Sequence, residues 1–305
     1  MDISRTRLLL SLAMGVVAVS LASVLIRMAQ RAGMGTLPIA AWRLVFASLI
    51  LVPYAWLTRR EEMRGLTRRE LGLLAISGVF LGLHFAAWIG SLSYTSVASS
   101  VVLVSMGPVF VGLGSWLFLR ERPGGLLTLG IVLAAAGSVV ISWGDLGQGQ
   151  DQLLGDLLAL VGAVMVAGYL MIGRKVRGRL TLGTYVAVVY GTAMVTLLLI
   201  VLVGRQPLLG FRPEAYGWVL ALALGPQIVG HSTLNWALRY LSATFVSIVT
   251  LAEPIGSGLL AYLLLGEPVT ISTFAGGVLV LVGIYIASRA ELATARRQAA
   301  GRGAG

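Results

Sequence analysis

The chain has no cysteine and few charged residues, and both shortages narrow the class of protein. Without cysteine there are no disulfides, thiolate nucleophiles or cysteine-ligated metals. Charged residues make up only 11% of the 305 residues, and hydrophobic residues make up 57%. A soluble chain carries about 25% charged residues. Because water cannot solvate such an apolar chain, the sequence predicts an all-α integral membrane protein whose main partner is the lipid bilayer.

The sequence also lacks the motifs that accompany catalysis. It contains no phosphate-binding loop of the Walker type, no Ser-His-Asp arrangement and no paired-carboxylate site. The chain has only two histidines, and no compact pattern of metal ligands surrounds them. We therefore expect a protein that is not an enzyme and that needs neither a cofactor nor a metal. The net charge of +11 does not indicate a nucleic-acid partner, because the arginines lie in short loops between apolar runs.

Apolar runs long enough to cross a bilayer recur along the chain. A spanning helix needs about 17–25 mostly apolar residues. By this criterion we predict ten transmembrane helices, at residues 8–30, 38–57, 71–92, 96–119, 126–143, 154–173, 184–203, 216–238, 243–265 and 271–289.

The distribution of basic residues between the loops predicts the orientation of these spans. If the N-terminus is inside, all but five of the 23 Lys and Arg residues lie in inside segments. Arg31, Arg205 and Arg212 lie in outside loops, and Arg27 and Arg43 lie within spans. Since basic loops stay in the cytoplasm, we expect a multi-pass protein of the cell (inner) membrane with both termini cytoplasmic.

The second half of the chain repeats the first. Ser96–Ser142 aligns without a gap with Ser242–Ser288 at a shift of 146 positions, which superimposes Pro108 on Pro254. Each copy has five predicted spans, an odd number, so the second copy must enter the membrane inverted. We predict two inverted five-helix repeats, residues 1–143 and 154–290, joined by a loop at 144–153 and followed by a cytoplasmic basic tail at 291–305.

Each repeat contains a helix of small and apolar residues with a proline in mid-span. This helix ends in Leu-x-Glu, at Leu119–Glu121 and Leu265–Glu267, and a glycine-rich span follows. The pattern resembles the EamA family of the drug/metabolite transporter (DMT) superfamily, and the resemblance covers nearly the whole chain. It implies a secondary transporter with a central cavity between inverted halves, which opens alternately to the two sides. Relatives export amino acids, other metabolites or drugs.

Glu253 and Arg43 are the ionisable residues within spans that best fit a substrate site. Glu253 lies in the middle of its span, where the repeat counterpart is Gly107. Burying a charge in the bilayer is costly, so such a residue faces a cavity or a partner. Glu253 is either a proton carrier or amine contact, or half of a structural pair with an arginine. Arg43 either binds a substrate carboxylate, or extends to the headgroups or to an acidic residue in a loop.

The two histidines occupy nearly equivalent positions in the two repeats. A shift of 146 from His84 gives position 230, next to His231. A histidine titrates near neutrality, which suits proton coupling or a hydrogen bond to substrate, but an interhelical hydrogen bond is the alternative. Trp88 and Asn235 each follow a histidine by four residues, so we expect each pair to share a helix face.

Two further side chains and three prolines complete the candidate set. Met106 and Tyr169 are candidates for the cavity lining, although ordinary helix packing explains each of them alone. Pro108, Pro254 and Pro226 free backbone carbonyls and permit bends, so they are either hinges or static kinks.

The leading hypothesis is a secondary transporter that exports amino acids or related amphipathic compounds by alternating access. Its partners would be a small-molecule substrate and, as a coupling ion, protons that act through Glu253 or a histidine. Two alternatives stay open: a multidrug-type exporter of the same fold, and a non-transporting membrane scaffold or lipid-handling protein. A lipid-modifying enzyme would need converging nucleophile or metal groups, which the sequence lacks. The oligomeric state does not follow from the sequence.

Overall fold

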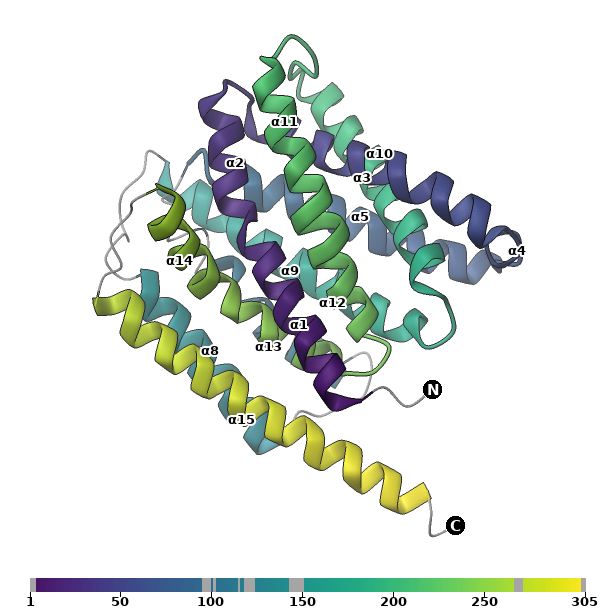
Figure 1. Cartoon of the computed structure of the whole chain (residues 1–305), viewed down its shortest axis with the longest axis vertical. Helices are drawn as coiled ribbons and strands as arrows, with labels where there is room; N and C mark the ends of the chain where they lie inside the picture. Colours follow the sequence, from purple (N-terminus) through teal and green to yellow (C-terminus); the bar gives the residue numbers. More distant parts are fainter. Residues whose placement is uncertain are drawn as a thin grey trace.

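The computed structural model describes residues 4–94, 100, 103–114, 116–117, 124–142, 151–265 and 271–302. All regular structure in these ranges is helical (Figure 1). The first half contains α1 (Arg5–Ser20), α2 (Ala22–Arg31), α3 (Thr36–Thr58), α4 (Arg60–Arg64), α5 (Arg68–Ser91), α7 (Gly107–Gly114) and α8 (Gly125–Ser142). The second half contains α9 (Gln152–Arg177), α10 (Leu182–Val203), α11 (Pro213–Leu222), the π-helix η3 (Ala223–His231), α12 (Ser232–Ala237), α13 (Ala243–Val249), the 3₁₀ turn η4 (Thr250–Ala252), α14 (Glu253–Leu265) and α15 (Ile271–Arg302).

Six helices in the described ranges are long and apolar enough to cross a membrane, which makes the chain a multi-pass membrane protein. Two shorter apolar helices, Gly125–Gly137 and Phe274–Ala287, add to them. The span expected at 216–238 is helical as α11, η3 and α12, and the one expected at 96–119 lies partly outside the described residues. The six helices are Thr6–Arg31, Thr36–Thr58, Arg68–Ser91, Leu153–Arg177, Leu182–Val203 and Ala243–Leu264.

Local sequence signals explain where several helices begin. Thr67 accepts from the backbone N–H of Glu70, whose side chain accepts from Thr67 in return, so a capping box starts α5. Thr181 caps α10 in the same way through the N–H of Thr184. Pro213 is the first residue of α11, a position where a residue without an N–H loses no helical hydrogen bond. At the other end of the chain, α15 continues past the membrane segment through the basic tail to Arg302.

Three of the predicted spans are interrupted at mid-length. A turn at Leu21 separates α1 from α2, the π-helix η3 separates α11 from α12, and η4 separates α13 from α14. The first and third breaks are joined, because Ser257 Oγ donates to the Ser20 carbonyl at 3.0 Å. Irregular backbone at membrane depth is tolerated where it lines a cavity or is buried in protein, so these breaks indicate where the functional centre lies.

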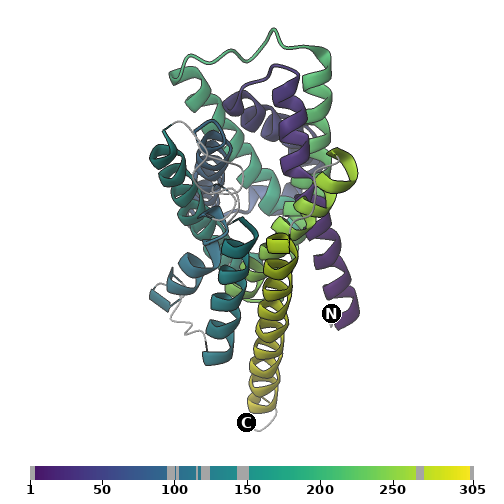
Figure 2. The same ribbon diagram turned by 90° about the vertical axis from the view of Figure 1, so that its left-hand side faces the viewer.

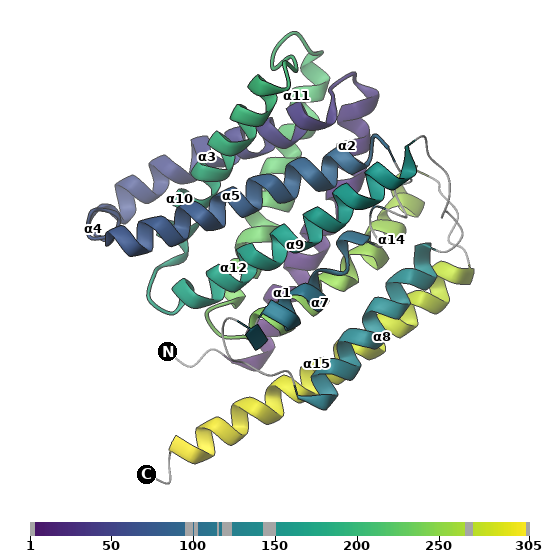
Figure 3. The ribbon, with the colours of Figure 1, turned by 180° about the vertical axis from the view of Figure 1, so that it is seen from behind.

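Helices far apart in sequence pack side by side. The pairs with most contact are α8 with α15, α5 with α9, and α10 with both α3 and α5, and α1 packs along η3. Figure 3 shows α5 beside α9, and α8 beside α15, from behind. Serine and tyrosine hydroxyls lie within the buried part of this packing, since Ser77 Oγ is 3.2 Å from Tyr185 Oη.

Glycines let α8 and α15 approach closely. A Cβ on Gly130 would lie 2.8 Å from the Gly283 carbonyl oxygen, and one on Gly283 would lie 2.7 Å from the Gly130 carbonyl oxygen. A Cβ on Gly137 would lie 2.6 Å from the carbonyl oxygen of Gly276. These distances are below those of real Cβ contacts, so only glycine permits this helix pair.

The N- and C-termini lie toward the same end of the helical bundle. Figure 1 places both marked ends and α4 toward the right and lower right. Figure 2 shows α15, in yellow, descending to the C-terminus past the neighbouring helices. The two ends of the chain therefore lie on one side of the bundle.

Candidate functional site

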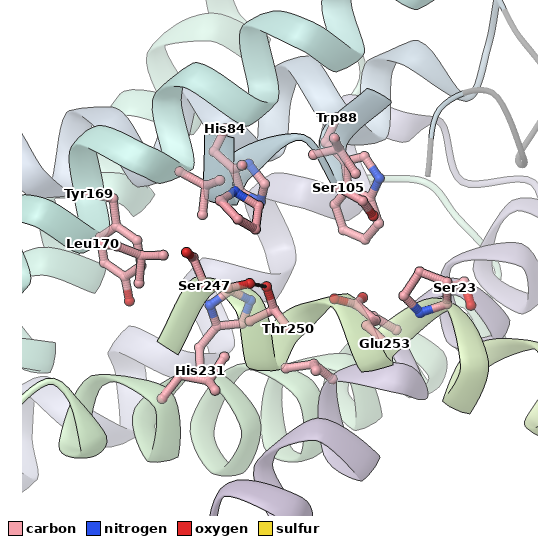
Figure 4. A pocket seen from close by; sticks show the side chains of 18 of the residues that line it. Ser23, His84, Trp88, Ser105, Tyr169, Leu170, His231, Ser247, Thr250 and Glu253 are labelled. Carbon is pink, nitrogen blue, oxygen red and sulfur yellow. Dashed lines mark hydrogen bonds between the residues drawn. The ribbon is translucent and has the colours of Figure 1, made fainter. Parts of the chain in front are cut away.

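A central cavity lies where the interrupted helices meet. It encloses about 940 Å³ of atom-free space, including the part that is open to solvent. Six of the eight predicted site residues line it: Arg43, His84, Trp88, Tyr169, His231 and Glu253. Figure 4 shows the cavity between a wall that carries His84 and Trp88 and a wall that carries His231 and Glu253. The remaining lining is Val19, Ala22, Ser23, Val104, Ser105, Gly107, Pro108, Val166, Leu170, Leu234, Ser247, Thr250, Pro254 and Ser257.

Arg43 of α3 is fully enclosed in the protein, with 1% of its surface exposed. Its Nε donates to Gln227 Oε1 at 2.7 Å, and its guanidinium carbon lies 4.1 Å from the centre of the Phe85 ring. Both terminal nitrogens, Nη1 and Nη2, have no hydrogen-bond partner in the described part of the chain. Extension to the headgroups is therefore wrong for Arg43, because neighbouring helices bury the side chain where it lines the cavity.

The His84 wall is aromatic. The rings of His84 and Trp88 stack with centroids 5.9 Å apart and an interplanar angle of 14°, as residues four apart on one helix face do. His84 Nδ1 lies 2.9 Å from the Gly162 carbonyl oxygen, which is its acceptor in the tautomer protonated at Nδ1. Trp88 Nε1 is buried without a partner among the described residues. Phe85 meets His231 edge to face at 5.3 Å, so the rings bridge the two walls.

Glu253 stands at the break between η4 and α14. A 3₁₀ turn precedes it, and Figure 4 shows Ser247 and Thr250, which also line the cavity, on the same segment. Thr250 Oγ1 donates to the Ser247 carbonyl at 2.6 Å. No hydrogen bond or ion pair of the Glu253 carboxylate appears within the described residues. This wall of the cavity offers an acidic group and hydroxyls to a ligand.

The two repeats differ around Glu253 by more than one residue. Ser20 Oγ lies 3.4 Å from the Glu253 carbonyl oxygen, and Ser257 bonds back to Ser20. At a shift of 146, the counterparts of Ser20, Glu253 and Ser257 are Val166, Gly107 and Val111. A polar junction in one half therefore corresponds to an apolar junction in the other.

Asn235 is buried beside the cavity instead of lining it. Its side-chain Nδ2 donates to Tyr190 Oη at 3.3 Å, and its backbone carbonyl accepts from Arg177 Nε at 3.0 Å. The four-residue spacing from His231 did not bring Asn235 into the cavity lining, because its side chain is directed to Tyr190 of α10.

The remaining predicted residues lie at or near the cavity. Pro108 and Pro254 line it. Pro226 is buried inside η3, where a residue without an N–H fits an interrupted hydrogen-bond pattern. Met106 lies between the lining residues Ser105 and Gly107 but is not itself part of the lining. Groups of three or more His, Cys, Asp or Glu side chains that could hold a metal are absent from the described ranges.

Sequence reasoning missed Gln227, Phe85 and the hydroxyls of the Glu253 wall. Serine and threonine are too common in membrane helices to stand out singly. Gln227 carried a usable signal, because a wholly buried amide within a predicted span is costly unless it is hydrogen-bonded.

A second polar cluster lies away from the cavity, between α4 and the start of α10. Glu62 accepts from the Thr181 N–H at 2.7 Å and from Thr184 Oγ1 at 2.6 Å. Partial burial by itself would raise the pKa of the Glu62 carboxyl, but the hydrogen bonds from Thr181 and Thr184, together with Arg59, lower this pKa below its usual range. The cluster ties the loop between α3 and α5 to the loop between α9 and α10.

Comparison with known sequences identifies relatives along the whole chain. The sequence matches the EamA-like transporter family over residues 6–143 and again over residues 153–289. It is 30% identical to an uncharacterized transporter of Archaeoglobus fulgidus over 264 residues, which cover 82% of this chain and 88% of the relative. It is 27% identical to the pseudopaline exporter of Pseudomonas aeruginosa over 257 residues, which cover 84% of this chain and 88% of that protein.

A solved crystal structure shares the fold. It superimposes with a TM-score of 0.77 and covers 95% of this chain and 99% of its own, at 18% sequence identity. At that identity the likeness supports the arrangement of helices and carries no information about substrate.

Proposed function

Because the chain belongs to the EamA-like transporter family, we propose that it exports small metabolites that carry both a carboxylate and a cationic group, such as amino acids and related compounds. The observation that carries this proposal is the pair of unpartnered charged groups in one cavity. Arg43 has two terminal nitrogens without a partner among the described residues, and the carboxylate of Glu253 lines the same cavity.

The hydrogen-bonding groups of the cavity are of two kinds. Buried donors without partners among the described residues lie at Arg43 and Trp88, and a ligand oxyanion would satisfy them. Acceptors lie along the Glu253 segment, where an ammonium group would find the carboxylate and hydroxyl oxygens. Since a buried unsatisfied polar group costs about 1–3 kcal/mol, a ligand that pairs with both sets gains more than one that pairs with either alone.

Helix packing supports transport between two inverted repeats. The two family matches divide the chain near residue 150. Contacts of α5 with α9 correspond, at a shift of 146, to those of η3 with α1. Gly130 contacts Gly283, and their counterparts Gly276 and Gly137 contact one another. Such reciprocity is expected of two units related by a twofold axis. We therefore propose ten spans, cytoplasmic termini and alternating access about the cavity in the cell (inner) membrane.

Proton coupling would use Glu253. A carboxylate that binds either a proton or the ammonium group of a substrate makes the two compete, and this competition links their movements across the membrane. Neither histidine is needed for such exchange, and in this proposal His84 and His231 shape the cavity.

A multidrug-type exporter of the same fold is the second candidate. The apolar lining from Val19, Val104, Val166, Leu170 and Leu234 favours it, because such a surface accepts amphipathic compounds without matching their charges. A drug-type site would tolerate loss of the substrate carboxylate, whereas a zwitterion site would not.

Transport into proteoliposomes tests both candidates. Labelled amino acids, dipeptides, amines that lack a carboxylate and lipophilic cations would be offered with and without a pH gradient. We expect saturable transport of zwitterions that a proton gradient increases. Transport of lipophilic cations alone would support the drug exporter, and no transport over the whole panel would favour a scaffold or lipid-handling protein.

A further inference from the structure

Gln227 contacts Arg43 but is not among the residues that line the cavity. It is part of the π-helix η3 and is completely buried. A π-helix carries an extra residue per turn and changes which side chains face inward, and such segments often occur at functional sites. Pro226 precedes Gln227 within the same irregular turn. The local backbone therefore positions an amide against α3, at a sequence separation of 184 residues.

The contact between the two side chains fixes the orientation of the guanidinium group. A guanidinium group has donors only, so the Gln227 amide must present its oxygen, and it accepts from Arg43 Nε at 2.7 Å. The face of the Phe85 ring packs 4.1 Å from the guanidinium carbon. With Nε bonded and one face covered, the free edge consists of Nη1 and Nη2, the edge that pairs with a carboxylate through two parallel hydrogen bonds.

The chemical type of the side chain at 227 is as important as its position. Glutamine accepts the hydrogen bond without adding charge, so the positive charge of Arg43 stays uncompensated at the cavity. A glutamate of the same shape would form a buried ion pair with Arg43 and satisfy it internally. Within the described residues Arg43 forms no ion pair, even with Glu253.

We propose that Gln227 is a specificity-determining residue: it holds Arg43 through a neutral acceptor, and so makes the cavity select substrates that bear a carboxylate. This inference rests on the function proposed above and deepens it. Gln227 does not line the cavity, so it acts through Arg43 as a positioning residue.

The test uses purified full-length protein and pairs of probes that differ only in the carboxyl group, namely tryptophan with tryptamine and histidine with histamine. Dissociation constants would be measured by isothermal titration calorimetry for the wild type, Gln227→Glu and the control Gln206→Glu. Gln206 is exposed in the loop that follows α10. The control adds the same charge by the same atom change, at an exposed position.

We expect the wild type and Gln206→Glu to bind the amino acid more tightly than its amine in at least one pair. Gln227→Glu should shift this ratio toward the amine by at least about tenfold, the equivalent of one charge-assisted hydrogen bond. Gln227→Leu removes the acceptor but adds no charge, so it should weaken binding of the amino acid and still leave it preferred over the amine.

The outcomes separate this inference from the proposed function. If the wild type prefers the amino acid and Gln227→Glu keeps the same ratio, the role of Gln227 is refuted and the substrate class stands. If Gln227→Glu does not fold, unchanged amino-acid affinity in Gln227→Leu refutes that role equally. If the wild type binds tryptophan and histidine no better than their amines, the zwitterion site itself is wrong.

Discussion

Gly137→Ala should destabilise the protein by separating α8 from α15. The added Cβ would lie 2.6 Å from the Gly276 carbonyl oxygen and 2.7 Å from the Val280 backbone nitrogen. Both neighbours are backbone atoms of a long helix, so they cannot rotate away as the end of a flexible side chain can. Ordinary van der Waals contact begins at 3.4 Å, and the helices must therefore move apart or bend.

The magnitude follows from overpacking of a close interface. Forcing one extra methyl group into packed structure costs about 1–3 kcal/mol, whereas Gly→Ala in an open helix position gains up to about 1 kcal/mol. Gly125 provides the matched control, because it begins the same helix and a Cβ there meets nothing within 4 Å. We expect Gly137→Ala to melt roughly 2–10 °C below Gly125→Ala.

The measurement is thermal unfolding of the purified protein in detergent, followed by tryptophan fluorescence. A double-mutant cycle adds a second test. Gly130→Ala and Gly283→Ala each introduce a clash with the other residue's carbonyl group. Because a single displacement of α8 from α15 relieves both clashes, the double variant should lose less stability than the two single variants together. If Gly137→Ala and Gly125→Ala have the same melting temperature, the close approach of α8 and α15 is refuted.

Three further predictions concern the polar residues. Glu253→Gln should abolish the dependence of transport on a proton gradient in proteoliposomes, and an unchanged gradient effect would rule out Glu253 as the coupling site. Ser257→Val copies the apolar residue of the other repeat and removes the 3.0 Å hydrogen bond to the Ser20 carbonyl. It should lower the free energy of unfolding by about 1 kcal/mol and slow transport more than it weakens substrate binding. Equal effects on transport and binding would contradict a role of this junction in transport. The pKa of Glu62 is lowered from 4.5, so its stabilisation exists above that pH and is lost as the pH falls through the folded-state pKa. Melting temperatures of Glu62→Gln should then fall less below pH 4.5 than those of the wild type and of the exposed control Glu61→Gln, and parallel curves would contradict this.

The sequence was sufficient to place the chain in the membrane and to find most of the candidate site. Glu253, His84 and His231 stood out because an ionisable residue in a bilayer is rare, and this rule needs no coordinates. The repeat gave further information, since it paired Glu253 with Gly107 and placed the two histidines at nearly equivalent positions.

Other features depended on contacts between helices that the sequence did not reveal. We predicted that Asn235 shares a face with His231, but Asn235 bonds to Tyr190 of α10 and does not line the cavity. The alternative that Arg43 extends to the headgroups was wrong for a similar reason. The partners of Arg43, Gln227 and Phe85, come from other helices, and no local sequence pattern predicts these contacts.

What the sequence predicts and what it does not predict depend on the range of the forces involved. Composition, hydropathy and loop charge act along the chain, so the sequence by itself determined the membrane class, the two-copy organisation and the residues whose burial needs a reason. The direction of a side chain within the bilayer depends on which helices meet and where each is broken. Only the tertiary structure could decide that Arg43 is held by Gln227 with its terminal nitrogens free, because that arrangement joins residues 184 positions apart.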